Sequence, residues 1–210
     1  MPVKYEIREK ALPKEIKQFH DLLKLLQAYY ANKSETVYFI CAPGINGANM
    51  DALLITSKAV VGIEFKNYGR DGYTIEATDN DWYVWNNLHE PVFDEEGNHL
   101  TVKGGSHKKN EKGAQYNNKA TVITQAETNR LYTNEQLVSF FHNNKDNDIR
   151  RRTQINLKSR IPWIVVFDKT LLIESKLGDR LSRWLKIANN HTFIDTLKKE
   201  LDGYLIISAK

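Results

Sequence analysis

The chain has 210 residues, of which 41% are hydrophobic and 27% are charged, as is typical of a soluble globular protein with a real core. Its one cysteine, Cys41, excludes an internal disulfide framework and a cysteine-rich zinc site. The formal net charge is +4, but residues 103–160 carry twelve Lys and Arg against five Asp and Glu, a net of +7, which leaves −3 for the rest. Such a stretch is typical of a surface that faces a polyanion, and an ordinary solvated loop surface is the alternative.

No apolar run approaches the length of a membrane span, and the N-terminus carries no charged-then-apolar leader. We therefore expect a cytoplasmic protein without membrane contact. The length suits a single domain over residues 1–210.

The first predicted elements are a helix and a strand. Apolar side chains recur at helical spacing over residues 13–30, and Pro13 suits the first helical position. An apolar run predicts a strand over residues 37–41. The turn-rich residues 42–47 then lead into a β-hairpin.

This first hairpin brings charged groups together. Two apolar, β-branched runs flank Ser57-Lys58, and with this pair as the loop the paired residue numbers sum to 115. Asp51 then lies opposite Glu64, and Lys66 shares a face with Glu64 because side chains alternate along a strand. Opposed carboxylates destabilise a sheet, and a bound Mg²⁺ or Mn²⁺ ion, which prefers oxygen ligands, would explain them.

The register of this hairpin depends on its loop. Ser-Lys is not a favoured pair for a tight hairpin turn, whereas Asn-Gly or Asp-Gly would be. A slip of one residue would move Asp51 to the other face of the sheet. Solvated charges at two strand ends are therefore the alternative to a metal site.

The middle of the chain predicts a second hairpin, a long insertion and a helix. The hairpin comprises residues 73–76 and 82–85, and it turns at residues 78–80. Residues 86–113 form a polar, Gly-rich insertion, and loops of this length are often functional. A helix is expected from about Ala114 or Asn118 to Tyr132, with a shorter helix over residues 134–142.

The last third predicts strands over residues 163–167 and 171–173, helices over 178–188 and 192–201, and a final strand over 204–207. The core order is helix, three strands, helix, strand (αβββαβ). It predicts an α/β fold with a mixed central β-sheet flanked by helices. The core covers residues 10–175, and residues 176–210 add the C-terminal helices and strand.

Several motifs resemble the nuclease-related domain (NERD) family, within the PD-(D/E)xK nuclease superfamily. The resemblance covers roughly residues 10–135 and rests on Lys14-Glu15, residues 47–51, residues 60–69, the second hairpin and Gln125. It implies a restriction-endonuclease-like core and a nuclease that hydrolyses DNA phosphodiester bonds, with RNA as an alternative substrate. Two positions depart from the family pattern. Met50 replaces the proline of the motif, and Thr121-Val122 replace an Asn-Pro pair that often precedes the helix glutamine.

The resemblance also implies roles for individual residues. Asp51 and Glu64 would ligate Mg²⁺ together with the backbone carbonyl of Phe65. Lys66 would orient or deprotonate the attacking water, or stabilise developing charge. Gln125 would orient Lys66 or touch the DNA backbone.

The remaining candidate site residues are one carboxylate and two clusters of basic side chains. The resemblance suggests that Glu15 holds a metal-bound water, although a carboxylate in a first helical turn is also favoured by the helix dipole alone. The residues expected to contact phosphates are Arg150, Arg151, Arg152, Lys108, Lys109 and Lys112. The leading hypothesis is an Mg²⁺-dependent (endo)nuclease. The alternative is a non-catalytic nucleic-acid-binding module on the same fold, and either version leaves room for a protein partner or a homodimer.

Overall fold

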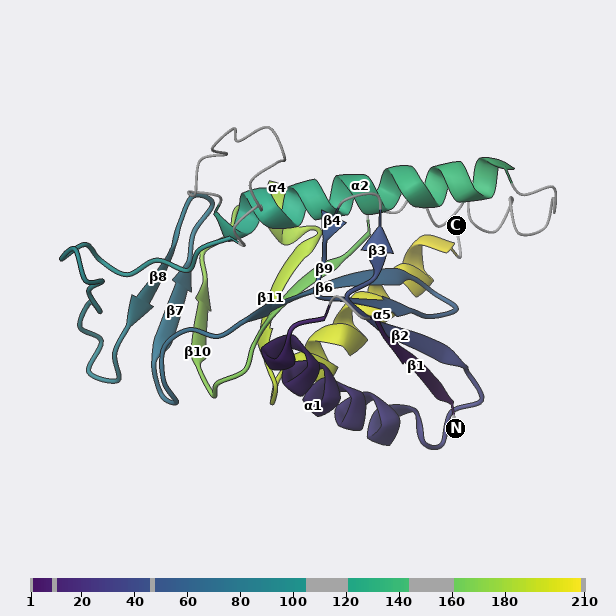
Figure 1. Cartoon of the computed structure of the whole chain (residues 1–210), viewed down its shortest axis with the longest axis horizontal. Coiled ribbons are helices and arrows are strands. Elements are labelled where there is room, and N and C mark those ends of the chain that lie inside the picture. The colour runs from purple at the N-terminus through teal and green to yellow at the C-terminus, as the bar shows by residue number, and fades with distance from the viewer. Residues whose placement is uncertain (1, 9–10, 46–47, 105–120, 144–160, 209–210) are drawn as a thin grey trace.

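The computed structural model describes residues 2–8, 11–45, 48–104, 121–143 and 161–208 (Figure 1). Within these residues a mixed α/β architecture surrounds a central sheet of six strands in the order β1-β2-β5-β6-β9-β11. The strands are β1 (Val3–Ile7), β2 (Val37–Cys41), β5 (Ala52–Ile55), β6 (Val60–Lys66), β9 (Trp163–Phe167) and β11 (Leu185–Asn189).

The central sheet is mixed, as the sequence predicted. Strand β5 runs antiparallel to both β2 and β6, whereas β1 is parallel to β2, and β6, β9 and β11 are parallel to one another. The edge strand β1 was not expected, because three of its five side chains are exposed and give no apolar pattern. A parallel sheet normally has both faces covered, and here helices and a second sheet cover the two faces.

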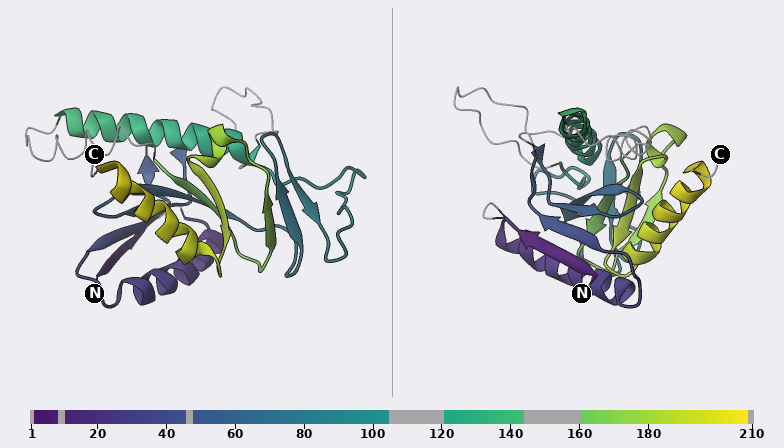
Figure 2. Two further views of the ribbon diagram at one scale, coloured as in Figure 1. Left: turned by 180° about the vertical axis from the view of Figure 1, so that it is seen from behind. Right: turned by 90° about the vertical axis from the view of Figure 1, so that its right-hand side faces the viewer.

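Helices α1 (Pro13–Tyr30) and α5 (Phe193–Ser208) cover one face of the sheet (Figure 2). Pro13 occupies the first turn of α1, and the Glu15 carboxylate accepts a hydrogen bond from Leu12 N at 2.9 Å. Phe19 of α1 stacks on Phe39 of β2 at 4.2 Å between ring centroids. The apolar stripe of α1 is therefore buried against the sheet, as its amphipathic pattern predicted.

Helix α2 (Val122–Asn143) lies on the opposite face, with the short helix α4 (Asp179–Ser182) and a three-stranded sheet. This second sheet has the order β10-β7-β8, formed by β10 (Leu172–Ser175), β7 (Thr74–Ala77) and β8 (Trp82–Trp85). Residues 86–104 return along β8, where Val84 N donates to Leu100 O and Val102 N to Trp82 O. We call β7, β8, β10 and residues 86–104 the wing, which projects from the side of the central sheet (Figure 1).

A small ladder of β3 (Gly44–Ile45) and β4 (Ala48–Asn49) lies against α2. The sequence predicted only a loop there. In the described part of the chain, no helix is long and apolar enough to cross a membrane.

Two helix predictions and one strand prediction were wrong. The expected break near residue 133 is absent: α2 is continuous there, and the buried Thr133 Oγ1 donates to Asn129 O at 2.7 Å. The helix expected over residues 178–188 ends at Ser182. Leu185–Asn189 instead form β11, because they pair with the edge of β9, whose side chains are all buried. The final strand is instead the end of α5, which continues the helical spacing of Leu197 and Leu201.

Candidate functional site

The first hairpin has the predicted register. Ala52 pairs with Ile63 and Ile55 with Val60, so paired numbers sum to 115. The loop is stabilised by Thr56, whose Oγ1 accepts hydrogen bonds from Lys58 N at 3.1 Å and Ala59 N at 2.9 Å. A hydroxyl thus supplies the turn geometry that Ser-Lys alone does not favour.

Asp51 lies directly before β5 and reaches across to β6. Its Oδ2 accepts a hydrogen bond from Phe65 N at 2.6 Å. Gly62 N donates to Pro162 O, and Asp168 N donates to Lys66 O, so the even-numbered peptide groups of β6 face β9. The peptide groups of Phe65 therefore face the Asp51 side, where β5 begins only at Ala52 and leaves the Phe65 carbonyl without a facing strand residue.

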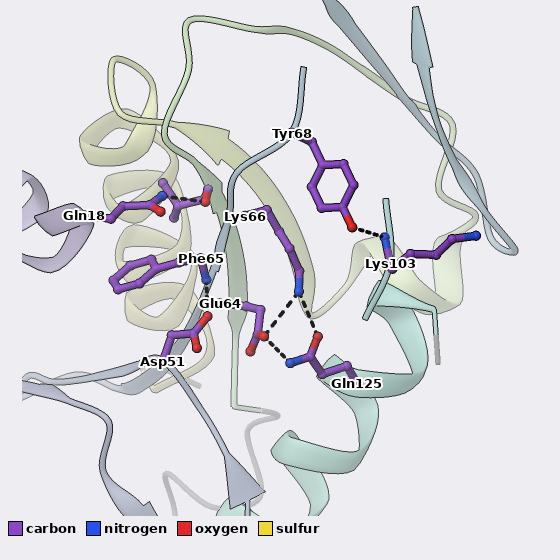
Figure 3. Close-up of polar contacts among 9 residues, drawn as sticks. Gln18, Asp51, Glu64, Phe65, Lys66, Tyr68, Lys103 and Gln125 are labelled. Atoms are coloured by element: carbon purple, nitrogen blue, oxygen red, sulfur yellow. Dashed lines mark hydrogen bonds and ion pairs between the residues drawn. The ribbon is translucent and has the colours of Figure 1, made fainter. Parts of the chain in front are cut away.

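The side chains of Glu64 and Lys66 point to the α2 face and meet Gln125 (Figure 3). Lys66 Nζ lies 3.4 Å from Glu64 Oε1 and donates to Gln125 Oε1 at 2.9 Å. Gln125 Nε2 donates in turn to the same Glu64 Oε1. Glu64 is only 1% exposed and Lys66 7%, so the three side chains form a closed, buried polar cluster.

One oxygen of this cluster has no partner. Glu64 Oε2 is buried and accepts no hydrogen bond within the part of the chain that the structure describes. A buried carboxylate oxygen without a donor is costly. It therefore indicates a place where a cation or an ordered water completes the cluster.

The electrostatics of the two carboxylates are unfavourable without a cation. Burial raises the pKa of Asp51 to about 6, the Phe65 N–H opposes this rise, and Glu15 adds to it. Burial, followed by the Asp51 charge, raises the pKa of Glu64 well above its ordinary value, and Lys66 offsets this only in part. Two carboxylates that disfavour each other's ionisation are the arrangement expected around a positive charge.

Helix α1 brings Glu15 within electrostatic range of both carboxylates. Sequence reasoning missed the role of Gln18, one turn further along α1. The buried Gln18 side chain donates from Nε2 to Val166 O of β9 at 2.8 Å (Figure 3). An amide on the apolar stripe of α1, three residues after Glu15, was the available signal.

Gly62 leaves space for the ring of Trp163 on the neighbouring strand β9. It pairs with Trp163 of β9, and a Cβ at Gly62 would lie 2.2 Å from two carbon atoms of the Trp163 ring. The side chain of Glu64, two residues further on, shares this face of β6. The glycine is therefore required by the close approach of an indole ring.

The hairpin, α2 and α1 thus assemble Asp51, Glu64, Lys66, Gln125 and, at longer range, Glu15. The predicted phosphate-contacting residues lie outside the described residues: Arg150, Arg151, Arg152, Lys108, Lys109 and Lys112. Among the residues described, no three His, Cys, Asp or Glu side chains are grouped so that they could hold a metal ion. Two carboxylates, a backbone carbonyl and water remain as the ligand set for a cation.

Comparisons of the chain with family models, curated proteins and solved structures found no match. The resemblance to the NERD family therefore stays a hypothesis drawn from the motif residues, and the function must be argued from the site itself.

Proposed function

We propose that the chain is a Mg²⁺- or Mn²⁺-dependent nuclease of the PD-(D/E)xK type, with a restriction-endonuclease-like core and membership of the NERD family. The observation that carries the proposal is the convergence of two carboxylates, a lysine and a glutamine around the orphaned Glu64 Oε2. The order α1, β2, β5, β6, α2, β9 is compatible with the αβββαβ core that the motif residues suggest.

The chemistry of the donor set fits a hard divalent cation. Asp51, Glu64 and the Phe65 carbonyl would supply oxygen ligands, and Mg²⁺ usually keeps several waters beside one or two carboxylates. The raised pKa values of both carboxyl groups indicate that a positive charge would relieve their repulsion. A cation at Glu64 Oε2 would also satisfy its buried lone pairs.

When bound, the ion would acidify a water molecule and neutralise a phosphate oxygen. The Lys66 ammonium would stabilise the charge that develops on the phosphate, and it is already held by Glu64 and Gln125. Gln125 orients both partners, since its amide donates to Glu64 and accepts from Lys66. Burial of the cluster strengthens these interactions by limiting the access of water.

The test is a plasmid-nicking assay in Mg²⁺ or Mn²⁺, with Lys66→Met as the main variant. Methionine keeps the length of the buried aliphatic stem and removes the ammonium group together with its contacts to Glu64 and Gln125. We expect cleavage to fall at least about a hundredfold, the size of effect seen when one group that stabilises transition-state charge is removed. DNA affinity should change little, because one buried charge contributes little to phosphate binding.

The matched control is Lys17→Met on the exposed side of α1, which removes one positive charge far from the cluster. It should nick DNA at the wild-type rate. Wild-type cleavage by Lys66→Met would refute the mechanism. A wild type that binds DNA but never cleaves it with either ion would favour the non-catalytic nucleic-acid-binding module.

A further inference from the structure

The wing carries a charge opposite to that of the rest of the chain. Residues 71–103 contain eight Asp and Glu and a single Lys, a net of −7, so the other residues together carry +11. Three of these acids accept backbone hydrogen bonds: Asp71 from Thr170 N and Asp79 from Gly178 N, which lie 99 positions away, and Asp94 from Asn98 N within a turn. Glu95 and Glu96 are exposed, and neither forms an ion pair with another of the described residues.

One face of the wing sheet is buried, and the other is partly covered but leaves Leu172 and Glu174 exposed. Ile75, Ala77, Trp82 and Val84 belong to the buried core. The register places Glu76 beside Tyr83 and beside Glu174, so these three side chains share the opposite face. Glu174 is exposed, and Glu76 pairs with Lys176 at 2.6 Å.

Apolar side chains lie among these acids. Leu88 is 73% exposed, Phe93 60% and Leu172 64%. Leu172 pairs with Thr74 and thus shares the open face with Glu174, while Phe93 pairs with His99 just before the turn that carries Glu95 and Glu96. Isolated exposed leucines are ordinary, but here exposed apolar side chains lie close to acidic ones, Leu172 beside Glu174 on β10 and Phe93 shortly before Glu95 and Glu96, which indicates a binding surface.

The charge selects the kind of partner. The formal charge of −7 over residues 71–103 disfavours contact with the phosphates of a nucleic acid, which favours a cationic partner over DNA for the wing. The Trp85 ring is also unavailable for stacking on a ligand such as a sugar, because two histidine side chains pack against it. His89 stacks on it at 5.0 Å with an interplanar angle of 9°, and His99 packs edge-on at 4.7 Å.

We propose that the wing is a docking surface for an Arg- and Lys-rich segment of a partner protein. Glu95, Glu96 and Glu174 would pair with its cationic groups. Phe93 and Leu172 would contact the aliphatic stems, and the Phe93 ring would also attract guanidinium groups. The proposal does not depend on the nuclease assignment, because it involves none of the residues around Glu64.

The test measures the binding of a fluorescently labelled oligo-arginine peptide by anisotropy at physiological ionic strength. The wing variant is Glu95→Gln, Glu96→Gln and Glu174→Gln together. The matched control neutralises three exposed acids on α5 and β1: Asp195→Asn, Asp202→Asn and Glu6→Gln. Both variants change the net charge equally. The wing variant should weaken binding about tenfold, as the loss of several exposed ion pairs would, and the control by less than about twofold.

A second variant, Phe93→Ser, tests the apolar part, since its exposed ring can be removed without opening the core. It should weaken oligo-arginine binding with all charges retained. Equal weakening by the wing variant and the control would overturn the proposal, as would unchanged binding in the wing variant. If light scattering shows that the wing variant dissociates an oligomer of the chain while peptide binding is unchanged, the wing binds a second copy of the chain and not a basic partner protein.

Discussion

Asp51→Asn should stabilise the protein in the absence of divalent ions, although it removes a hydrogen-bonded carboxylate. The amide oxygen of asparagine can still accept the Phe65 N–H that Asp51 accepts at 2.6 Å. What the substitution removes is a buried negative charge, which burial and Glu15 disfavour and which itself raises the pKa of Glu64. The wild-type charge is therefore a cost to the metal-free fold.

The magnitude follows from the pKa of Asp51, which rises from 3.8 to about 6 on folding. At 1.36 kcal/mol per pKa unit this rise corresponds to about 3 kcal/mol. The folded state holds the proton more tightly than the unfolded state. The contribution of Asp51 to stability is therefore most favourable below pH 3.8, falls as the pH rises to about 6, and is constant above that value. Glu64, whose pKa is also raised, extends the loss to higher pH.

The assay is urea denaturation in EDTA across this pH range, on the wild type, Asp51→Asn and the control Asp21→Asn. At neutral pH, Asp51→Asn should gain up to about 3 kcal/mol, which is up to about 10 °C in Tm for a chain of this size. The gain should vanish below pH 3.8, where Asp51 becomes protonated in both the folded and the unfolded state. Asp21→Asn, a change at a half-buried position of α1 whose carboxylate pairs only with Lys17 among the described residues, at 3.5 Å, should have a small effect. A loss of stability in Asp51→Asn at neutral pH would refute the reasoning.

Three further changes test other parts of the molecule. Millimolar Mg²⁺ or Mn²⁺ should raise the Tm of the wild type but not of Glu64→Gln, because the ion binds only the folded site; a wild type indifferent to both ions argues against a metal. Gly62→Ala should lower the free energy of unfolding by about 2 kcal/mol in urea, since its Cβ would overlap the Trp163 ring, and an unchanged midpoint would contradict the close packing seen there. Neutralising Arg150, Arg151 and Arg152 should flatten the salt dependence of DNA binding, by about 0.9 in the log–log slope for each phosphate that the protein no longer neutralises. If that slope is unchanged, the same change at Lys108, Lys109 and Lys112 should flatten it instead, and no effect in either variant would leave an ordinary solvated surface.

The hairpin and its register could be predicted because the information is local. Side-chain alternation and a two-residue loop place Asp51 opposite Glu64 and put Lys66 on the face of Glu64. The bounds of α1, β2 and β9 follow for the same reason, from apolar periodicity and an N-terminal proline. The contact of Gln125 with Lys66 was implied only by a motif resemblance, because it joins residues 59 positions apart.

The errors arise where tertiary pairing overrides local pattern. Leu185–Asn189 became a strand because β9 offered an open neighbouring edge, which the residues themselves do not reveal. The short β3–β4 ladder is too brief for a periodic signal, and β1 exposes most of its side chains. Gln18 was missed because an amide on the apolar stripe of α1 does not reveal its partner, which is a backbone carbonyl of β9.

The contact between Gln18 and Val166 spans 148 residues and ties the first helix to a strand near the end of the chain. Strand β6 likewise pairs with β9, which follows it in the chain only after the wing strands β7 and β8 and helix α2. Contacts of such long separation form late, because the entropy of closing the intervening loop must be overcome first. The hairpin can close early and bring Asp51 and Glu64 together before Gln125 arrives. We therefore expect slow folding, with completion of the polar cluster among its last steps.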